Sequence, residues 1–214
     1  MSLLELTEFF EDRMHSYRFL ATMYQTALSA EFIEQLLAMD PHIETPLDDC
    51  IEAMRNCDPE QLRIDLAAEY NRVFLGMGPD PIAPFESVYT SPERLLMQDA
   101  RDKVLALYRQ ESLKRASEAF IPEDHISMEF EYMAHLCEVA AQASVEDDAA
   151  KTEEYLTKQR DFLHNHLLVW VFDMCIDMEK RVKTDFYKAI CSITRQQLEN
   201  DREWFAQHDT SSFS

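Results

Sequence analysis

Glycine is almost absent from this sequence, with 2 residues among 214. Both, Gly76 and Gly78, lie in the stretch 70–92, which also holds four of the eight prolines. Proline lacks an amide hydrogen and disfavours helix in the residue before it, and glycine supplies backbone angles that other residues resist. The stretch 70–92 is therefore predicted to be the main non-helical segment, and its many apolar residues predict that it folds onto the body of the protein.

Positive charge is also scarce, with 20 Lys and Arg residues against 41 Asp and Glu residues and a net charge of -21. The excess is concentrated in residues 1–60, with 13 acids and 3 bases, and in residues 121–154, with 10 acids and 1 base. Such a field repels nucleic acid and anionic membranes and attracts basic partners. A nucleic-acid partner is therefore not expected, although acidic faces also serve solubility alone.

Long hydrophobic runs and paired cysteines are missing as well. No apolar run approaches the ~18 residues of a membrane span, and the start of the chain has acids where a secretory signal needs bases. The five cysteines are odd in number and form no C-x-x-C pair, which is typical of reduced thiols in a cytosolic protein. We expect a cytoplasmic protein without stable membrane insertion.

What the sequence has instead is helical periodicity. Apolar residues at steps of three and four predict a first helix from Ser2 to about Leu28. Capping and proline signals predict the starts of the others. The predicted later helices begin at Ser29, at Thr45-Pro46, at Asp58-Pro59, at Ser91-Pro92 (ending near Tyr108), at Pro122, at about 148 (ending near 180) and at Thr184.

No convincing strand pattern and no internal repeat accompany these helices. The fold prediction is all-α, with about eight to ten helices and one long ordered Gly/Pro-rich loop. The whole chain, 1–214, is expected to be a single domain. Its N-terminal half covers about 1–120, its C-terminal half about 121–206, and 207–214 is a frayed tail.

The patterns that carry chemistry in other helical proteins are not met here. A di-iron bundle needs two Glu-x-x-His motifs, and this sequence has none, so no metal, cofactor or catalytic residue is predicted. Ser87 does not lie in a G-x-S-x-G motif, and the pair Gly76 and Gly78 lacks the third glycine of a phosphate-binding loop. Weak nucleotide binding stays open.

Two constellations allow both a structural and a functional interpretation. Asp124 and His125 lie at a predicted helix start, where their side chains can reach solvent or a groove; in the structural interpretation, Asp124 or Glu123 caps the helix and His125 is a surface residue. Phe162, His166 and Trp170 share one face of a predicted helix, as a core stripe or as part of a site. Periodicity and spacing alone favour the structural interpretation of both.

Three blocks of sequence resemble a known family. They read Tyr70-Asn-Arg-Val-Phe-Leu-Gly76 with Pro84-Phe-Glu-Ser-Val-Tyr89, Pro122-Glu-Asp-His-Ile126 with Glu129, and Phe162-Leu-His-Asn-His-Leu-Leu-Val-Trp170. In this order they are similar to the motifs of the TorD/DmsD/NarJ family of redox-enzyme maturation chaperones, above all its TorD/DmsD branch. Two features depart from the family: Ile121 stands where a glutamate is usual, and the stretch between Gly76 and Pro84 is idiosyncratic.

The resemblance implies a non-enzymatic cytoplasmic chaperone. Such proteins bind the twin-arginine signal peptide of a molybdopterin-containing oxidoreductase precursor, in some cases also its body, and hold it until the cofactor is inserted. The acidic charge suits the arginines, and a groove of aromatic and methionine side chains suits the apolar part of the signal. The peptide-binding residues implied are Phe74, Phe85, Glu86, Ser87, Tyr89, Asp124, His125, Glu129, His166 and Trp170.

Two other hypotheses stay open at this point. One is a helical-bundle enzyme with a metal or small-molecule site, and the other is a helical adaptor for a different basic partner. The sequence identifies neither the client enzyme nor the oligomeric state, so a monomer, a dimer and a domain-swapped dimer are all compatible with it.

Overall fold

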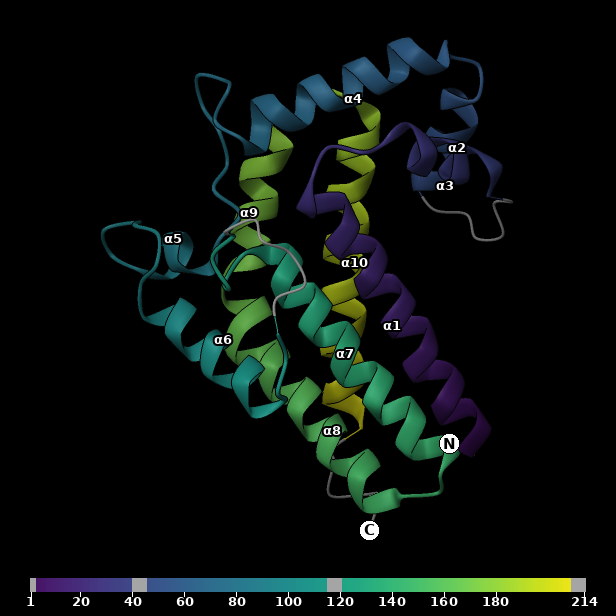
Figure 1. The fold of residues 1–214 in the computed structure, drawn as a ribbon, viewed down its shortest axis with the longest axis vertical. Coiled ribbons are helices and arrows are strands. Elements are labelled where there is room, and N and C mark those ends of the chain that lie inside the picture. Colours follow the sequence, from purple (N-terminus) through teal and green to yellow (C-terminus); the bar gives the residue numbers. More distant parts are fainter. Residues whose placement is uncertain (1–2, 40–45, 115–120, 209–214) are drawn as a thin grey trace.

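The computed structural model describes residues 3–39, 46–114 and 121–208. These residues form ten α-helices and one π-helical turn (Figure 1). The helices are α1 (Leu3–Gln25), α2 (Ala30–Ala38), α3 (Pro46–Met54), α4 (Pro59–Phe74), α5 (Glu86–Thr90), α6 (Asp99–Gln110), α7 (Ile126–Val145), α8 (Ala149–Phe162), the π-turn (Leu163–Leu167), α9 (Leu168–Arg181) and α10 (Asp185–Gln207). Within the described ranges there is no strand, only an isolated bridge between Phe85 and His125, so the all-α prediction is confirmed.

The long helices build the body of the molecule. Helix α1 packs along α7, α7 packs on α8, and α10 packs on α9. Figure 1 shows α2, α3 and α4 at one end of this bundle, and α5 and α6 at its side. Aromatic and sulfur-containing side chains fill the interior, and the largest fully buried ones include Trp170, Tyr17, Tyr24, Tyr187, Phe10, Phe130 and Met133. That the chain is a single domain stays a prediction.

Three of the predicted helix starts carry the expected caps. The side-chain oxygens of Ser29, Asp58 and Thr184 accept the backbone N–H three residues on, at 3.1, 2.8 and 3.4 Å. Each oxygen satisfies an amide that would otherwise have no partner in the first turn. The predicted caps at Ser2 and Thr45 lie outside the described residues.

The Gly/Pro-rich stretch is ordered, but a short helix divides it. Residues 75–85 are irregular, α5 follows, and residues 91–98 are irregular again. Gly76 has a φ of 72°, which glycine adopts readily, and a Cβ on Gly78 would come within 2.7 Å of the Arg72 carbonyl oxygen. The Ile82 N–H donates to the Val73 carbonyl at 2.7 Å, which holds the stretch against the end of α4.

Two predicted helix starts are wrong. Helix α6 begins at Asp99 instead of Pro92, because the Ser87 hydroxyl accepts the Gln98 N–H at 3.1 Å and holds the intervening residues against α5. Helix α7 begins at Ile126 instead of Pro122, because the backbone before it pairs with the α5 segment. In that pairing the Ile126 N–H donates to the Pro84 carbonyl at 2.9 Å.

The helix predicted over about 148–180 is present but not uniform. It consists of α8, the π-turn and α9, which follow one another without an intervening loop. The apolar periodicity does not indicate the wider turn at Leu163–Leu167. The polar stretch 110–120 lies partly outside the described residues, which end at 114 and resume at 121.

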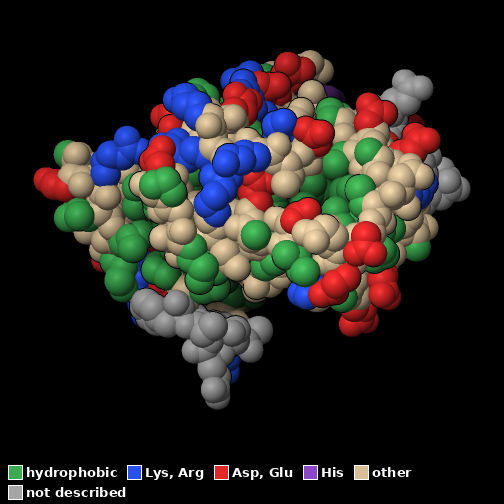
Figure 2. All heavy atoms as spheres, turned by 90° about the horizontal axis from the view of Figure 1, so that it is seen from above, with side chains coloured by type: hydrophobic (Ala, Val, Ile, Leu, Met, Phe, Trp, Pro, Cys, Tyr) green, Lys and Arg blue, Asp and Glu red, His purple; other side chains and the backbone are tan. Residues whose placement is uncertain are grey.

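Charge is unevenly distributed over the surface. On the face seen in Figure 2, Lys and Arg side chains gather toward the upper left and Asp and Glu side chains toward the right, with hydrophobic side chains exposed between them. Within the described residues, no helix combines the length and the hydropathy that a membrane crossing requires.

A buried ion pair ties the N-terminal helix to the C-terminal one. The Arg13 guanidinium donates to both carboxylate oxygens of Asp201, from Nε at 3.0 Å and from Nη2 at 2.6 Å. The Tyr17 hydroxyl adds a bond of 2.6 Å to Asp201, and Gln159 on α8 accepts from Arg13 Nη1. Arg13 and Asp201 are almost completely buried, so each charge depends on the other for its solvation.

We predict that Asp201→Asn strongly destabilises the fold, because it leaves the buried Arg13 without its counter-charge. Removing one partner of a buried pair typically costs about 3–5 kcal/mol. The surface variant Glu179→Gln breaks the exposed contact with Arg195 and should cost at most about 1 kcal/mol. Urea unfolding of the two variants tests this, and equal losses of stability would contradict the importance of the buried pair.

Candidate functional site

Nine of the ten residues expected in the site lie in one connected cluster. They come from three neighbouring segments: residues 85–89 around α5, the turn before α7 with its first helical turn, and the π-turn with the start of α9. The members are Phe85, Glu86, Ser87, Tyr89, Asp124, His125, Glu129, His166 and Trp170. The three sequence blocks that carry the family resemblance thus meet in space.

Asp124 joins the first two segments and is fully buried. Its Oδ2 accepts the Ser87 N–H at 2.9 Å, and its carbonyl oxygen accepts the Glu86 N–H at 2.9 Å. Asp124 therefore caps α5, 37 residues away in the sequence, and not the helix that follows it. The idea that its carboxylate reaches solvent does not agree with this position, because its side chain is enclosed by the protein.

Two buried glutamates, Glu86 at the start of α5 and Glu129 in the first turn of α7, lie close together in the protein interior. The His166 ring Nδ1 and Glu86 Oε2 are 2.8 Å apart, and the Trp170 indole N–H donates to Glu129 Oε2 at 3.0 Å. Glu129 is fully buried, and burial, followed by the neighbouring charge of Glu86, raises its pKa well above the usual value of 4.5. A neutral Glu129 carboxyl avoids a second buried negative charge beside Glu86.

The same carboxyl groups affect the pKa of Tyr108 on α6. The Tyr108 hydroxyl on α6 donates to the Glu123 carbonyl at 3.1 Å. Burial, together with the charges of Glu129 and other nearby groups, raises the pKa of Tyr108 well above 10. The phenol therefore stays protonated at physiological pH and donates its hydrogen bond to the backbone.

His125 begins α7 as its N-cap. Its Nδ1 accepts the Ser127 N–H at 3.2 Å and lies 2.7 Å from the Ser127 hydroxyl, and its ring meets the Phe85 ring edge-on with centroids 4.9 Å apart. Burial lowers the pKa of His125 to about 4, so the imidazole is neutral at physiological pH. His125 is therefore a buried N-cap and not the surface residue of the structural interpretation, and its neutral ring has no charge to offer a ligand.

Phe74 is the one expected residue that lies elsewhere. Its ring packs on the rings of Tyr24, Tyr70 and Tyr187, with centroids 5.8, 5.2 and 6.0 Å apart. These partners belong to α1, α4 and α10 and form part of the core. The sequence placed Phe74 close to the Gly/Pro-rich stretch, but the ring is on the inner face of the last turn of α4.

Tyr89 and Trp170 form the outer edge of the cluster. Their rings lie 5.5 Å apart, and the Tyr89 hydroxyl is 3.5 Å from a carboxylate oxygen of Asp177. The guanidinium of Arg94 lies over the Tyr89 ring at 5.3 Å and its Nη2 is 3.9 Å from Asp177. The irregular residues 91–98 are thereby fixed to α9 as well as to α5.

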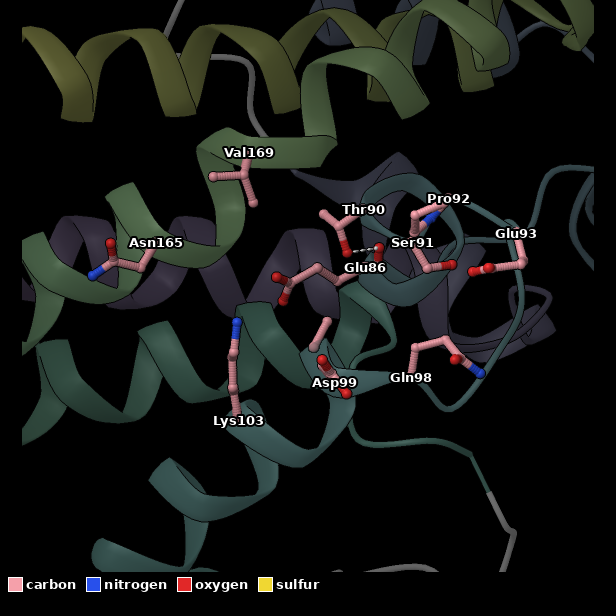
Figure 3. Close-up of a pocket in the computed structure, with 11 residues that line it drawn as sticks. Glu86, Thr90, Ser91, Pro92, Glu93, Gln98, Asp99, Lys103, Asn165 and Val169 are labelled. Atoms are coloured by element: carbon pink, nitrogen blue, oxygen red, sulfur yellow. Dashed lines mark hydrogen bonds between the residues drawn. The ribbon is translucent and has the colours of Figure 1, made fainter.

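A pocket of about 460 Å³ opens beside the cluster (Figure 3). Its walls come from α5, residues 91–98, the start of α6, and the junction of the π-turn with α9. They are formed by Glu86, Thr90, Ser91, Pro92, Glu93, Gln98, Asp99, Ala100, Lys103, Asn165 and Val169. In Figure 3 the carboxylate of Glu86 points to the side where Lys103, Asn165 and Val169 line the pocket. Glu86 therefore belongs both to the buried cluster and to the pocket.

The segment beside the pocket exposes an apolar run. Leu95, Leu96 and Met97 are 55%, 46% and 46% exposed, and Val169 on the opposite wall is 47% exposed. Arg94 and Met97 have positive φ angles of 53° and 58°, an uncommon backbone conformation for residues other than glycine. Apolar residues held in solvent on a fixed backbone are typical of a binding surface.

Sequence reasoning missed most of the residues that line this pocket. It assigned residues 92–108 to one helix, which hid the exposed run at 95–97. The run Leu-Leu-Met at 95–97, close after Ser91-Pro92-Glu93, was a usable signal, because a helix stripe would have separated three such residues. Lys103, Asn165 and Val169 gave no signal, since only the fold brings them to α5.

We predict that the stability of Glu129→Gln relative to wild type increases as the pH rises. Native Glu129 keeps its proton above 4.5, whereas the unfolded chain loses it, so wild-type stability falls with pH by up to about 1.4 kcal/mol per unit until the native pKa is reached. Glutamine does not titrate, and its amide can still donate to Glu86.

Urea unfolding at pH 6 and pH 8 measures this effect. The difference in stability between Glu129→Gln and wild type should grow toward pH 8. The exposed variant Glu34→Gln on α2 serves as control and should change by the same amount at both pH values. Parallel pH curves for Glu129→Gln and wild type would mean that Glu129 is ionised in the native protein.

The cluster offers no evident centre for metal chemistry. Among the residues that the structure describes, no three His, Cys, Asp or Glu side chains are arranged to hold a metal ion. The four side chains nearest to such an arrangement, those of Glu86, Asp124, Glu129 and His166, are engaged with Trp170, with the Ser87 amide or with one another.

Comparison with known proteins yields a family and several relatives. The model of the family described as nitrate reductase delta subunit matches residues 26–175. A chaperone protein TorD from Aliivibrio fischeri is 25% identical over 94% of this chain and 98% of its own, and one from Aliivibrio salmonicida is 24% identical over the same shares. A TorD from Photobacterium profundum is 25% identical over 86% of this chain and 90% of its own.

Among solved structures, a redox enzyme maturation protein from Archaeoglobus fulgidus matches with 22% identity and a TM-score of 0.38. It covers 70% of this chain and 90% of that chain, a likeness too distant to carry an argument. The family model is different, because it extends over most of the chain and includes all three sequence blocks that meet in the cluster. This protein belongs to the nitrate reductase delta subunit family, which includes the TorD-like maturation chaperones that its motifs resemble.

Proposed function

We propose that the protein is a cytoplasmic chaperone for the maturation of a molybdopterin-containing oxidoreductase, and that it binds the twin-arginine signal peptide of the precursor. The observation that carries the proposal is the surface around residues 91–98. There an exposed apolar run lies beside an acidic pocket, and Glu86, Asn165 and Val169 of the pocket belong to segments that resemble the family motifs.

The chemistry of a twin-arginine signal suits this surface. Such a signal has a basic start and an apolar middle. Its binding site must therefore offer acidic groups to the first part and apolar surface to the second. The net charge of -21 attracts the basic part over a distance of about one Debye length, ~8 Å at physiological ionic strength. The leucines and methionine at 95–97 accept varied apolar sequences, because methionine and leucine side chains adapt their shape.

The buried cluster has a supporting part in this proposal. Asp124, His125 and Glu129 are enclosed, so they hold α5 and the neighbouring segment in place and do not themselves contact the peptide. The buried carboxyl network thereby sets the position of Glu86 and Ser87, on which residues 91–98 rest. A change in Asp124 would act on the peptide indirectly, through α5.

The client is identified by capture with tagged protein from its own cytoplasm. Under the proposal, an oxidoreductase precursor co-purifies with its signal peptide still attached. Capture of a partner without a twin-arginine signal would instead support the second hypothesis, a helical adaptor for another basic protein.

Binding of a synthetic twin-arginine signal peptide to the purified wild-type protein should weaken as salt rises. Each screened contact between an arginine and a carboxylate lowers the affinity, whereas burial of apolar surface is insensitive to moderate salt. Calorimetric titration at low and at physiological ionic strength measures the change. No binding at either ionic strength would refute the proposed function.

The variant Leu95→Ser/Leu96→Ser should weaken binding of the same peptide by roughly tenfold. Both side chains are exposed in the free protein, so the melting temperature should hardly change, and the loss reflects apolar area buried only in the complex. Val145→Ser, which alters a 65% exposed side chain at the end of α7, is the matched control and should bind like wild type. Equal affinities of the double variant and the control would place the apolar contact elsewhere.

A further inference from the structure

The pocket beside α5 carries an unusual set of unpaired charges. Three carboxylates line it, those of Glu86, Glu93 and Asp99, against one ammonium group, that of Lys103. Glu86 is 5% exposed at its side chain and meets only the His166 ring as a basic partner. In the described part of the chain, Glu93, Asp99 and Lys103 have no ion-pair partner, whereas Glu123 and Asp177 nearby do.

This arrangement differs from an ordinary solvated acidic face. A solvated face is convex, whereas these carboxylates line a pocket of about 460 Å³, Glu86 with a buried side chain and Glu93 and Asp99 with exposed ones. A guanidinium or ammonium group with part of its alkyl stem fits such a volume. The buried Glu86 carboxylate interacts with a cation more strongly than an exposed carboxylate does, since less water screens it.

The apolar residues of the pocket suit the rest of a basic side chain. Val169 and Pro92 both line it, and Val169 is 47% exposed. Apolar walls accept the methylene stem of an arginine or lysine while the charged head reaches the carboxylates. The pocket also borders residues 95–97, so a chain with a basic residue in the pocket would run its next residues onto the apolar run.

We propose that this pocket is the subsite for a positively charged side chain of the client, paired with Glu86, Glu93 and Asp99, and that Lys103 is its built-in competitor. The inference rests on the proposed function and specifies which part of the signal lies where. The arginines occupy the pocket, and the apolar middle of the signal lies over residues 95–97.

For Lys103, the proposal predicts that loss of a charged side chain strengthens binding. In the free protein its ammonium group neutralises part of the acidic potential of the pocket, and an entering cation must tolerate or displace it. Removing this charge should therefore improve binding of a basic peptide, although the variant deletes a contact and adds none. A merely structural role of Lys103 predicts no change or a loss.

The test uses the full chain and two synthetic peptides, calorimetrically titrated. One peptide has two consecutive arginines followed by a leucine-rich stretch, and the other has glutamines in place of the arginines. Glu93→Gln/Asp99→Asn should weaken binding of the arginine peptide by roughly five- to twentyfold, and Lys103→Gln should strengthen it by roughly two- to fivefold. Neither variant should change binding of the glutamine peptide.

Two controls make the result specific. Glu34→Gln removes one exposed carboxylate from α2, which lies across the molecule from α5 in Figure 1, and should bind both peptides like wild type. Melting temperatures establish that the variants fold, which is expected because Glu93, Asp99 and Lys103 are exposed. Glu86→Gln should weaken the arginine peptide at least as much as the double variant, but it also alters the bond to His166.

The outcomes separate this inference from the proposed function. Wild-type binding of the arginine peptide together with unchanged affinity in the pocket variants would overturn the subsite and leave the proposed function intact. Absence of binding by the wild type would overturn both. A loss in Lys103→Gln equal to that in Glu93→Gln/Asp99→Asn would also overturn the subsite, because the two changes must act with opposite sign.

Discussion

The region around α5 depends on the burial of three carboxyl groups in a protein that already carries a large negative charge. Glu86, Asp124 and Glu129 are at most 5% exposed, and burying a carboxylate is costly unless hydrogen bonds or a proton compensate for the lost water. Each group is compensated differently. The Asp124 carboxylate accepts the Ser87 amide, Glu86 meets His166, and Glu129 has a raised pKa and accepts from Trp170.

This compensation links segments that are distant in the sequence. A buried acceptor needs its donors in place, so α5 forms only where Asp124 can cap it, and α9 must present Trp170 to Glu129. These bonds position the pocket and the exposed run at 95–97, since the Ser87 hydroxyl accepts the Gln98 amide. The polar interior therefore fixes the shape of a surface that makes none of those bonds itself.

Local signals in the sequence predicted most of the helices. Ser29, Asp58 and Thr184 each cap the helix predicted for them, because a cap depends only on residues three positions apart. The starts at Pro92 and Pro122 failed, because contacts with α5 override the local preference there. The same reason explains the site: Asp124 was predicted near a helix start, but its bond to Ser87 bridges 37 residues and leaves no local pattern.

The π-turn at Leu163–Leu167 sets a length requirement on the chain. Each residue of an α-helix advances the direction of its side chain by roughly 100°, so one residue more or less in this turn would rotate all of α9 relative to α8 by about that angle. His166 and Trp170 would then face away from Glu86 and Glu129, while Phe162 would stay in its place. Residues in the segment 162–170 can be substituted during evolution more easily than a residue can be inserted or deleted there.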